Sequence, residues 1–297
     1  MEREKMQKFA EELKGPFDFS MARKPETQYF EMQTQFVYFG FDGKRTKTET
    51  YFLKLRGTPA SVAGKKLDQY TCKEFGLQFN ANRIANIPKL KNWEYEFDLM
   101  SAINGGPVFG IPHAIFESLQ DDKGNNISPD ICYCIYNNFV DFHAFNDAFS
   151  RPMFGRGIDL LKHIGDQIVH PAAGSKAPVN LGSIVKPGSV FNNGEVTLEC
   201  KGVSLVDGKP CALVGYDSGE STLNMTVVYP DGKEVTTIGG SEYKGDMYID
   251  LESGWVRKTT LDEFVITKTE EKPGYTVRHL ILRLTDKEYF EKEFVAN

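Results

Sequence analysis

One stretch of the chain, residues 139–152 (FVDFHAFNDAFSRP), places a histidine between two aspartates and among phenylalanines. If the stretch is extended, Asp141 shares a face with His143 and could orient its imidazole, as a general base requires. If the stretch is helical, His143 and Asp147 become i,i+4 neighbours instead. Desolvation by phenylalanine together with one carboxylate is how proteins tune the pKa of a histidine. His143 is therefore the first candidate for acid–base catalysis, and a hydrogen-bonded structural histidine is the competing interpretation.

A second group of candidates lies in residues 156–170, whose apolar spacing predicts an amphipathic helix. One side of that helix would carry two imidazoles and two carboxylates, from Asp159, His163, Asp166 and His170. Neutral imidazole and carboxylate are ligands for transition metals, so His163, Asp166 and His170 are predicted metal ligands. A solvated helix face with weak Asp–His pairs explains the same pattern without a metal.

The remaining catalytic candidate is His113, which follows a turn-rich segment, residues 105–112 (GGPVFGIP). A loop of this kind can present a side chain to a cleft, so His113 is grouped with His143 and its carboxylate. The sequence contains no nucleophile elbow, phosphate-binding loop, His-Glu-x-x-His zinc motif or dinucleotide-binding glycine fingerprint. No particular cofactor is indicated, and its identity stays open.

Ligand contacts are predicted in the strand-like residues 245–251 (GDMYIDL), where Asp246, Tyr248 and Asp250 share one face. If that face is concave, these side chains would contact a polar ligand. Tyr136 and Phe142, from the aromatic middle of the chain, are expected to line the ligand site as well.

Composition limits the classes of partner. The 297 residues are 40% hydrophobic and 26% charged with a net charge of −6, and no run of Lys and Arg exceeds two residues. Nucleic acids and anionic membranes both require a basic surface, so neither is an expected partner. No apolar window is long enough to span a membrane, and the charged N-terminus is not a signal peptide. The chain as written is expected in the cytoplasm, or in the periplasm or outside the cell if a leader was removed, with its five cysteines reduced.

Strand-like segments dominate the chain. An amphipathic helix is expected at 3–13, alternating strands begin near residue 28, and an antiparallel meander with Asp-Gly and Ser-Gly turns runs from 195 onward. The middle begins as a strand at 131 and turns helical near Asn138. The polar loop 171–194 predicts a boundary between two lobes, 1–175 and 190–297. The expected fold is β-rich α+β, with curved antiparallel sheets, a central helical segment and an N-terminal helix.

Two further patterns bear on the fold. Residues 53–65 and 198–209 both place a V-x-G-K turn after an apolar strand, which suggests an internal duplication. Residues 245–264 (GDMYIDLESGWVRKTTLDEF) resemble the repeated strands of the bacterial lipoprotein-carrier and lipoprotein half-barrels. The resemblance implies a curved antiparallel sheet whose concave side, covered by helices, holds an apolar ligand.

These observations predict a binding protein for an apolar or amphipathic small molecule held between curved sheet and helices. The alternative is an enzyme of the hydrolase, lyase or isomerase type, metal-dependent or free of cofactor, that uses His and Asp for acid–base chemistry. The alternative requires the candidate histidines to converge in one cleft, and it loses support if His143 is sealed in the core.

Overall fold

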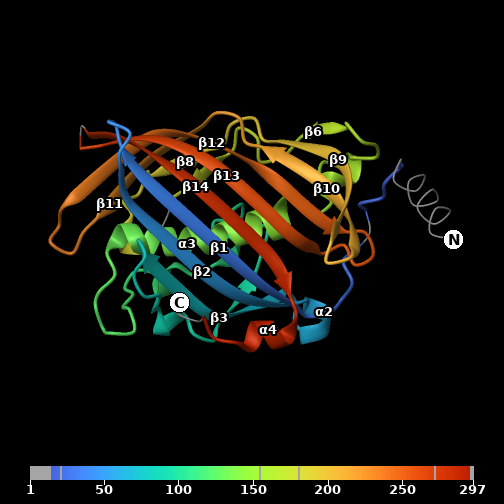
Figure 1. The fold of residues 1–297 in the computed structure, drawn as a ribbon, viewed down its shortest axis with the longest axis horizontal. Helices are drawn as coiled ribbons and strands as arrows, with labels where there is room; N and C mark the ends of the chain where they lie inside the picture. The colour runs from blue at the N-terminus through green and yellow to red at the C-terminus, as the bar shows by residue number, and fades with distance from the viewer. Residues whose placement is uncertain (1–14, 21, 154, 180, 271, 295–297) are drawn as a thin grey trace.

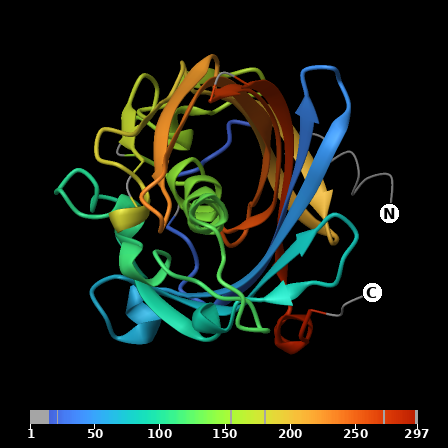
Figure 2. The same cartoon turned by 90° about the vertical axis from the view of Figure 1, so that its left-hand side faces the viewer.

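The computed structural model describes residues 15–294 except 21, 154, 180 and 271, so the helix expected at 3–13 lies outside the described residues. One large antiparallel sheet curves around a central helix, and Figure 1 shows its long strands crossing in front of that helix. Figure 2 shows the helix nearly end-on, with the strands arranged around it. The predicted fold class, a β-rich α+β fold with curved antiparallel sheet and a central helix, is confirmed.

The described strands all belong to this one sheet, in the order β4-β3-β2-β1-β14-β13-β12-β10-β9-β6, with β5 on β3, β11 on β12, β8 on β11 and β7 on β8. Their bounds are β1 Gln28–Gly40, β2 Arg45–Thr58, β3 Asp68–Phe79, β4 Ala85–Asn86, β5 Trp93–Phe97, β6 Gln167–Val169, β7 Lys176–Pro178, β8 Val190–Asn192, β9 Thr197–Val206, β10 Lys209–Asp217, β11 Ser221–Val228, β12 Glu234–Asp250, β13 Val256–Thr269 and β14 Lys272–Thr285. The helices are α2 Ala60–Ala63, α3 Pro129–His143 with a π-helical turn at Ala144–Ala148, and α4 Lys287–Glu291, with single 3₁₀ turns at Pro88–Leu90, Val108–Gly110, His113–Ile115, Ile158–Leu160 and Gly182–Ile184.

The sheet crosses the expected boundary at 171–194 without interruption. β6 precedes this loop and pairs with β9 after it, and β1 pairs with β14 from Tyr29 opposite Thr285 to Gly40 opposite Gly274. The two stretches that suggested a duplication differ locally. Val206–Lys209 forms the tight β9–β10 turn, whereas Val62–Lys65 spans the end of α2. The five cysteines are free, and none of the described helices is long and apolar enough to cross a membrane.

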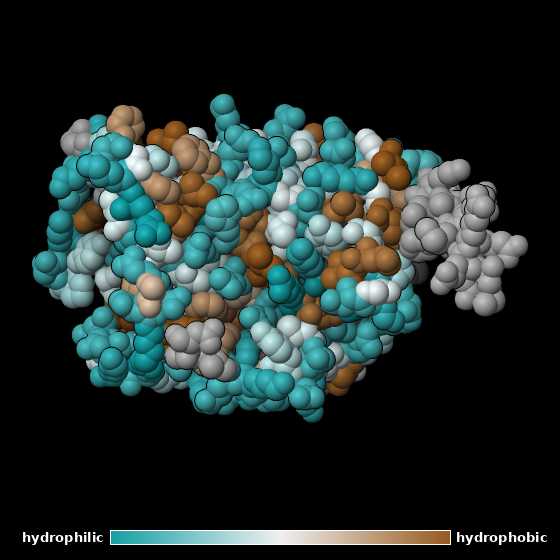
Figure 3. All heavy atoms as spheres, viewed as in Figure 1, coloured by the Kyte–Doolittle hydropathy of each residue, from teal (hydrophilic) through white to brown (hydrophobic). Residues whose placement is uncertain are grey.

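Strand alternation defines a concave and a convex face. In β14, Leu280 and Leu282 point to the core while His279 and Ile281 point outward, which is the pattern of a sheet packed on one side only. Hydrophilic residues cover most of the outer surface in Figure 3, with hydrophobic residues scattered between them. The concave face therefore carries the core, and α3 lies against it.

The central helix begins earlier than the sequence indicated. The expectation of a strand at 131 is wrong, because α3 starts at Pro129, where a proline without an N–H fits the first helical turn. A short apolar run such as residues 131–136 does not distinguish strand from helix by periodicity. Aromatic rings fill the space between helix and sheet: Phe139 stacks on Phe75 at 5.9 Å between ring centroids, and Phe142 meets Phe30 edge-on at 5.1 Å.

Candidate functional site

The histidine at the end of α3 is completely buried, and both of its ring nitrogens are occupied. Because the segment is helical, its carboxylate partner is Asp147, with Oδ2 at 2.8 Å from Nδ1. The hydroxyl of Tyr95 lies 2.7 Å from Nε2. An ionised carboxylate only accepts hydrogen bonds, so Nδ1 of His143 donates to it and Nε2 accepts from the tyrosine. Burial lowers the pKa of His143 in spite of the nearby carboxylate, which keeps the ring neutral at pH 7.

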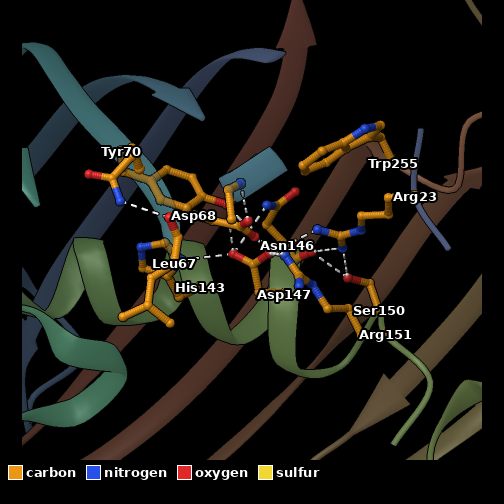
Figure 4. Close-up of polar contacts among 12 residues, drawn as sticks. Arg23, Leu67, Asp68, Tyr70, His143, Asn146, Asp147, Ser150, Arg151 and Trp255 are labelled. Carbon is orange, nitrogen blue, oxygen red and sulfur yellow. Dashed lines mark hydrogen bonds and ion pairs between the residues drawn. The ribbon is translucent and has the colours of Figure 1, made fainter. Parts of the chain in front are cut away.

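Asp147 is the centre of a buried ion-pair network, shown in Figure 4. Its Oδ1 accepts from Nη1 of Arg23 and from Nη2 of Arg151, both at 2.8 Å. The hydroxyl of Tyr70 adds longer contacts of 3.2 and 3.4 Å. Burial alone would raise the pKa of Asp147, but the two guanidiniums and the imidazole hold this pKa well below its usual range. The carboxylate is therefore ionised at neutral pH.

The two arginines come from different elements and are fixed differently. Arg23 belongs to the segment that precedes β1, packs 4.5 Å over the ring of Trp255, and donates from Nη2 to the hydroxyl of Ser150 at 2.8 Å and to the carbonyl of Asn146. Arg151 follows the π-helical turn and donates from Nη2 to Oδ2 of Asp68 at 3.0 Å. The network thus joins the N-terminal segment, the end of α3 and the start of β3.

A partly open cleft of about 320 Å³ lies beside this network. Arg23, Asp68, Ser150 and Arg151 form its polar floor. Its other lining residues are mainly apolar, including Phe19, Pro25, Pro59, Pro152, Ile158, Ile249, Leu251 and Trp255. The cleft is small for a ligand site, at the lower end of the range of about 300–1,000 Å³ seen for small-molecule pockets.

The other catalytic candidates, Asp141 and His113, have different partners, and Phe142 packs edge-on against the ring of His143. Asp141 points from α3 to Arg278 of β14, with Nη1 and Oδ2 2.5 Å apart. His113 is partly buried, and its Nε2 lies 3.3 Å from the hydroxyl of Tyr136. Phe142 is fully buried in the core. Within the described part of the chain, no hydrogen bond or ring contact links His113 to His143.

The prediction of a helix at 156–170 is wrong. The predicted metal ligands are therefore not aligned on one helix face. The segment forms a 3₁₀ turn and β6 instead. His163 is exposed and pairs with Asp166, whereas His170 is buried against Phe149 with ring centroids 4.8 Å apart. Burial lowers the pKa of His170 to about 4. Across the residues that the structure describes, no three His, Cys, Asp or Glu side chains are arranged to hold a metal ion.

Of the three ligand contacts predicted in β12, one lies at the cleft. Met247 and Ile249 face the core, so Asp246 and Tyr248 point to the convex side, where Asp246 pairs with Lys201 at 2.7 Å. Asp250 ends the strand and lines the cleft. Its Oδ1 accepts from the amides of residues 252 and 253, which fixes the turn after β12.

Sequence reasoning missed both arginines of the network. Arg151 stands four residues after Asp147, so the helical alternative contained a signal for it in the i,i+4 spacing. Arg23 is 124 residues from its carboxylate in the chain, and no local pattern joins the two. Trp255 was part of the stretch that resembles the half-barrels, but its position against a guanidinium depends on the tertiary fold.

Comparison with known proteins adds no relative. No family model matches the chain, and no curated protein matches it. Among solved structures it is similar to OmpTdeltaL8, a loop L8 deletion mutant of the outer membrane protein OmpT of Vibrio cholerae, with 8% identity, a TM-score of 0.17 and coverage of 88% of this chain and 99% of that one. An anion-selective porin from Comamonas acidovorans gives 9% identity, a TM-score of 0.16 and coverage of 88% and 99%. At such TM-scores the likeness carries no argument.

Proposed function

We propose that this chain binds a small amphipathic molecule in the cleft at the end of α3. The observation that carries the proposal is the cleft itself, which combines apolar walls with a polar floor of arginine and aspartate side chains. Ligand sites typically have this composition, because apolar area supplies affinity while a few placed polar groups fix orientation. Along α3 itself, aromatic rings such as Phe139 and Phe142 pack against the sheet.

The floor of the cleft is preorganised. Arg23 is held by a carboxylate, a hydroxyl, a carbonyl and the face of Trp255. Arg151 is held by two carboxylates and packs 5.5 Å from the ring centre of Phe97. Side chains fixed before binding lose little conformational entropy when a ligand arrives, so even a small ligand can gain net affinity.

The enzymatic alternative has weaker support. An acid–base histidine needs one ring nitrogen that can reach the substrate. His143 is sealed in the core with Asp147 on one nitrogen and Tyr95 on the other. This arrangement is that of a structural histidine which positions the carboxylate beneath the cleft.

Isothermal titration calorimetry with hexanoate, 1-hexanol and hexylamine tests the proposal at pH 7. Ala22 is exposed and lines the cleft, so Ala22→Trp should occupy the space. Ala81 is exposed in a turn outside the lining, and Ala81→Trp is the matched control. We expect wild type and A81W to bind at least one of the three probes at a single site, and A22W to bind none. Failure of wild type to bind any probe, or unchanged binding by A22W, would overturn the proposal.

A further inference from the structure

We infer that the ligand of this cleft presents a carboxylate to Arg151, an inference that rests on the proposed binding function. The cleft is lined by three cationic side chains and three carboxylates, so net charge does not decide which ligand group fits. The decision depends on which of these groups already have protein partners.

Arg151 keeps unused donors at the cleft. The hydrogen bonds that Arg151 donates to Asp68 and Asp147 both come from Nη2. Its Nη1 makes no hydrogen bond to the described residues, and the side chain as a whole is 28% exposed and lines the cleft. Nη1 therefore offers two N–H groups to a ligand. Arg23 differs, because both of its Nη atoms are engaged and only 10% of its side chain is exposed.

Two of the three acidic side chains that line the cleft already use both carboxylate oxygens. Asp68 accepts from the amide of residue 60 at 2.8 Å through Oδ1 and from Arg151 through Oδ2. Asp250 accepts two turn amides through Oδ1, and its Oδ2 faces Arg257 at 3.3 Å. Asp18, at the rim, accepts from Ser20 through Oδ1 and is the one lining carboxylate whose second oxygen has no hydrogen bond to the described residues.

An acceptor on the ligand thus meets free donors, while an ammonium group would compete with the protein for acceptors everywhere except at the exposed Asp18. A carboxylate on a guanidinium forms charge-assisted hydrogen bonds that are about twice as strong as neutral ones. Lys24 at the same cleft adds to this balance, because its pairing with Glu252 at 2.6 Å engages one of the three N–H donors of its Nζ. The apolar remainder of the ligand would lie on Pro25, Pro59 and Pro152.

The same calorimetric series separates the inference from the proposed function. We expect wild type to bind hexanoate about tenfold or more tightly than 1-hexanol, and hexylamine most weakly. Arg151→Gln should remove the preference for hexanoate over 1-hexanol. Arg83→Gln, which breaks an exposed ion pair with Asp122, is the control and should leave the preference unchanged.

The outcomes distinguish the preference for a carboxylate from the binding function itself. Equal affinity for the three probes, or tightest binding of hexylamine, would overturn the carboxylate while the binding function stands, and an amine preference would point to Asp18. Binding of none of the probes overturns both. If R151Q does not fold by circular dichroism, Arg151→Lys replaces it and should retain only part of the preference, because an ammonium lacks the guanidinium fork. The wild-type ranking decides in either case.

Discussion

Two buried aspartates on the same helical stretch, Asp147 and Asp141, show how the number of cations around a carboxylate sets its ionisation. Asp147 has two arginines and a histidine around it, and its pKa is held well below the usual range. Asp141 shares a single arginine, Arg278, with a second carboxylate, Glu263. Burial raises the pKa of Asp141 to about 6, and Glu263 adds to the shift while Arg278 opposes it.

The two clusters also differ in what they connect. The Asp141 cluster joins α3 to β13 and β14 inside the core, where Ser241 of β12 donates to Glu263. The Asp147 cluster lies at the end of the helix and forms the floor of the cleft. An excess of cations thus keeps the carboxylate beside the cleft charged, whereas a shared cation produces a carboxylate that titrates within the fold.

The largest effect expected from this comparison is on stability. Asp147→Asn leaves the buried guanidinium of Arg23 without a counter-ion, while Arg151 keeps only Asp68, and breaking a buried pair in this way costs about 3–5 kcal/mol. Asp141→Asn leaves Arg278 paired with Glu263, so its cost at pH 7 should stay below about 1.5 kcal/mol. Urea denaturation of both variants measures the difference. Equal losses of free energy of unfolding would show that the two clusters are equivalent.

The second prediction concerns the pH dependence of stability. Because the pKa of Asp141 is raised to about 6, the folded protein retains a proton that the unfolded chain releases near pH 4. The stabilising contribution is therefore complete below about pH 4 and is lost as the pH rises to about 6, a change of about 3 kcal/mol. The lowered pKa of His143 acts in the opposite direction, with stability lost as the pH falls below about 6.5.

Because these two slopes oppose each other, the informative quantity is the difference between wild type and D141N. Urea denaturation at intervals between pH 4 and 6.5 should show wild type losing stability relative to D141N as the pH rises. A constant difference over this range would mean that Asp141 does not titrate in the folded protein.

The clusters differ as well in how far the sequence defines them. The i,i+4 pairing of His143 with Asp147 follows from local spacing once the segment is helical, and the phenylalanines around it indicated burial. Arg23 and Arg278 reach their carboxylates through tertiary contacts between residues more than a hundred positions apart, which local patterns do not encode. The pairing of His143 with Asp147 was therefore predictable, but the distant counter-ions Arg23 and Arg278 were not.

The prediction of a helix at 156–170 was wrong for a different, local reason. Its apolar spacing is helical, yet Gly165 adopts a positive φ of 90°, and the carboxylate of Asp166 accepts from the amides of Lys162 and His163. Such side-chain-to-backbone bonds offer the chain an alternative to the helix, and a glycine in the middle makes that alternative available at little cost. Periodicity alone gave no weight to either feature.

The smallest expected effect is the difference in stability between phenylalanine variants of the two tyrosines near Asp147, Tyr95 and Tyr70. Tyr95 donates its short bond of 2.7 Å to His143, so Tyr95→Phe leaves a buried ring nitrogen unpaired and should cost about 1–3 kcal/mol. Tyr70 makes only bonds of 3.2 and 3.4 Å to a carboxylate that keeps four other donors, so Tyr70→Phe should cost less than about 1 kcal/mol. Both substitutions remove one hydroxyl from a buried ring, so each controls for the packing change of the other. If Y70F proves the more damaging in urea denaturation, the hydroxyl of Tyr70 matters to Asp147 in spite of its four other donors, which contradicts the argument that the cations around this carboxylate suffice.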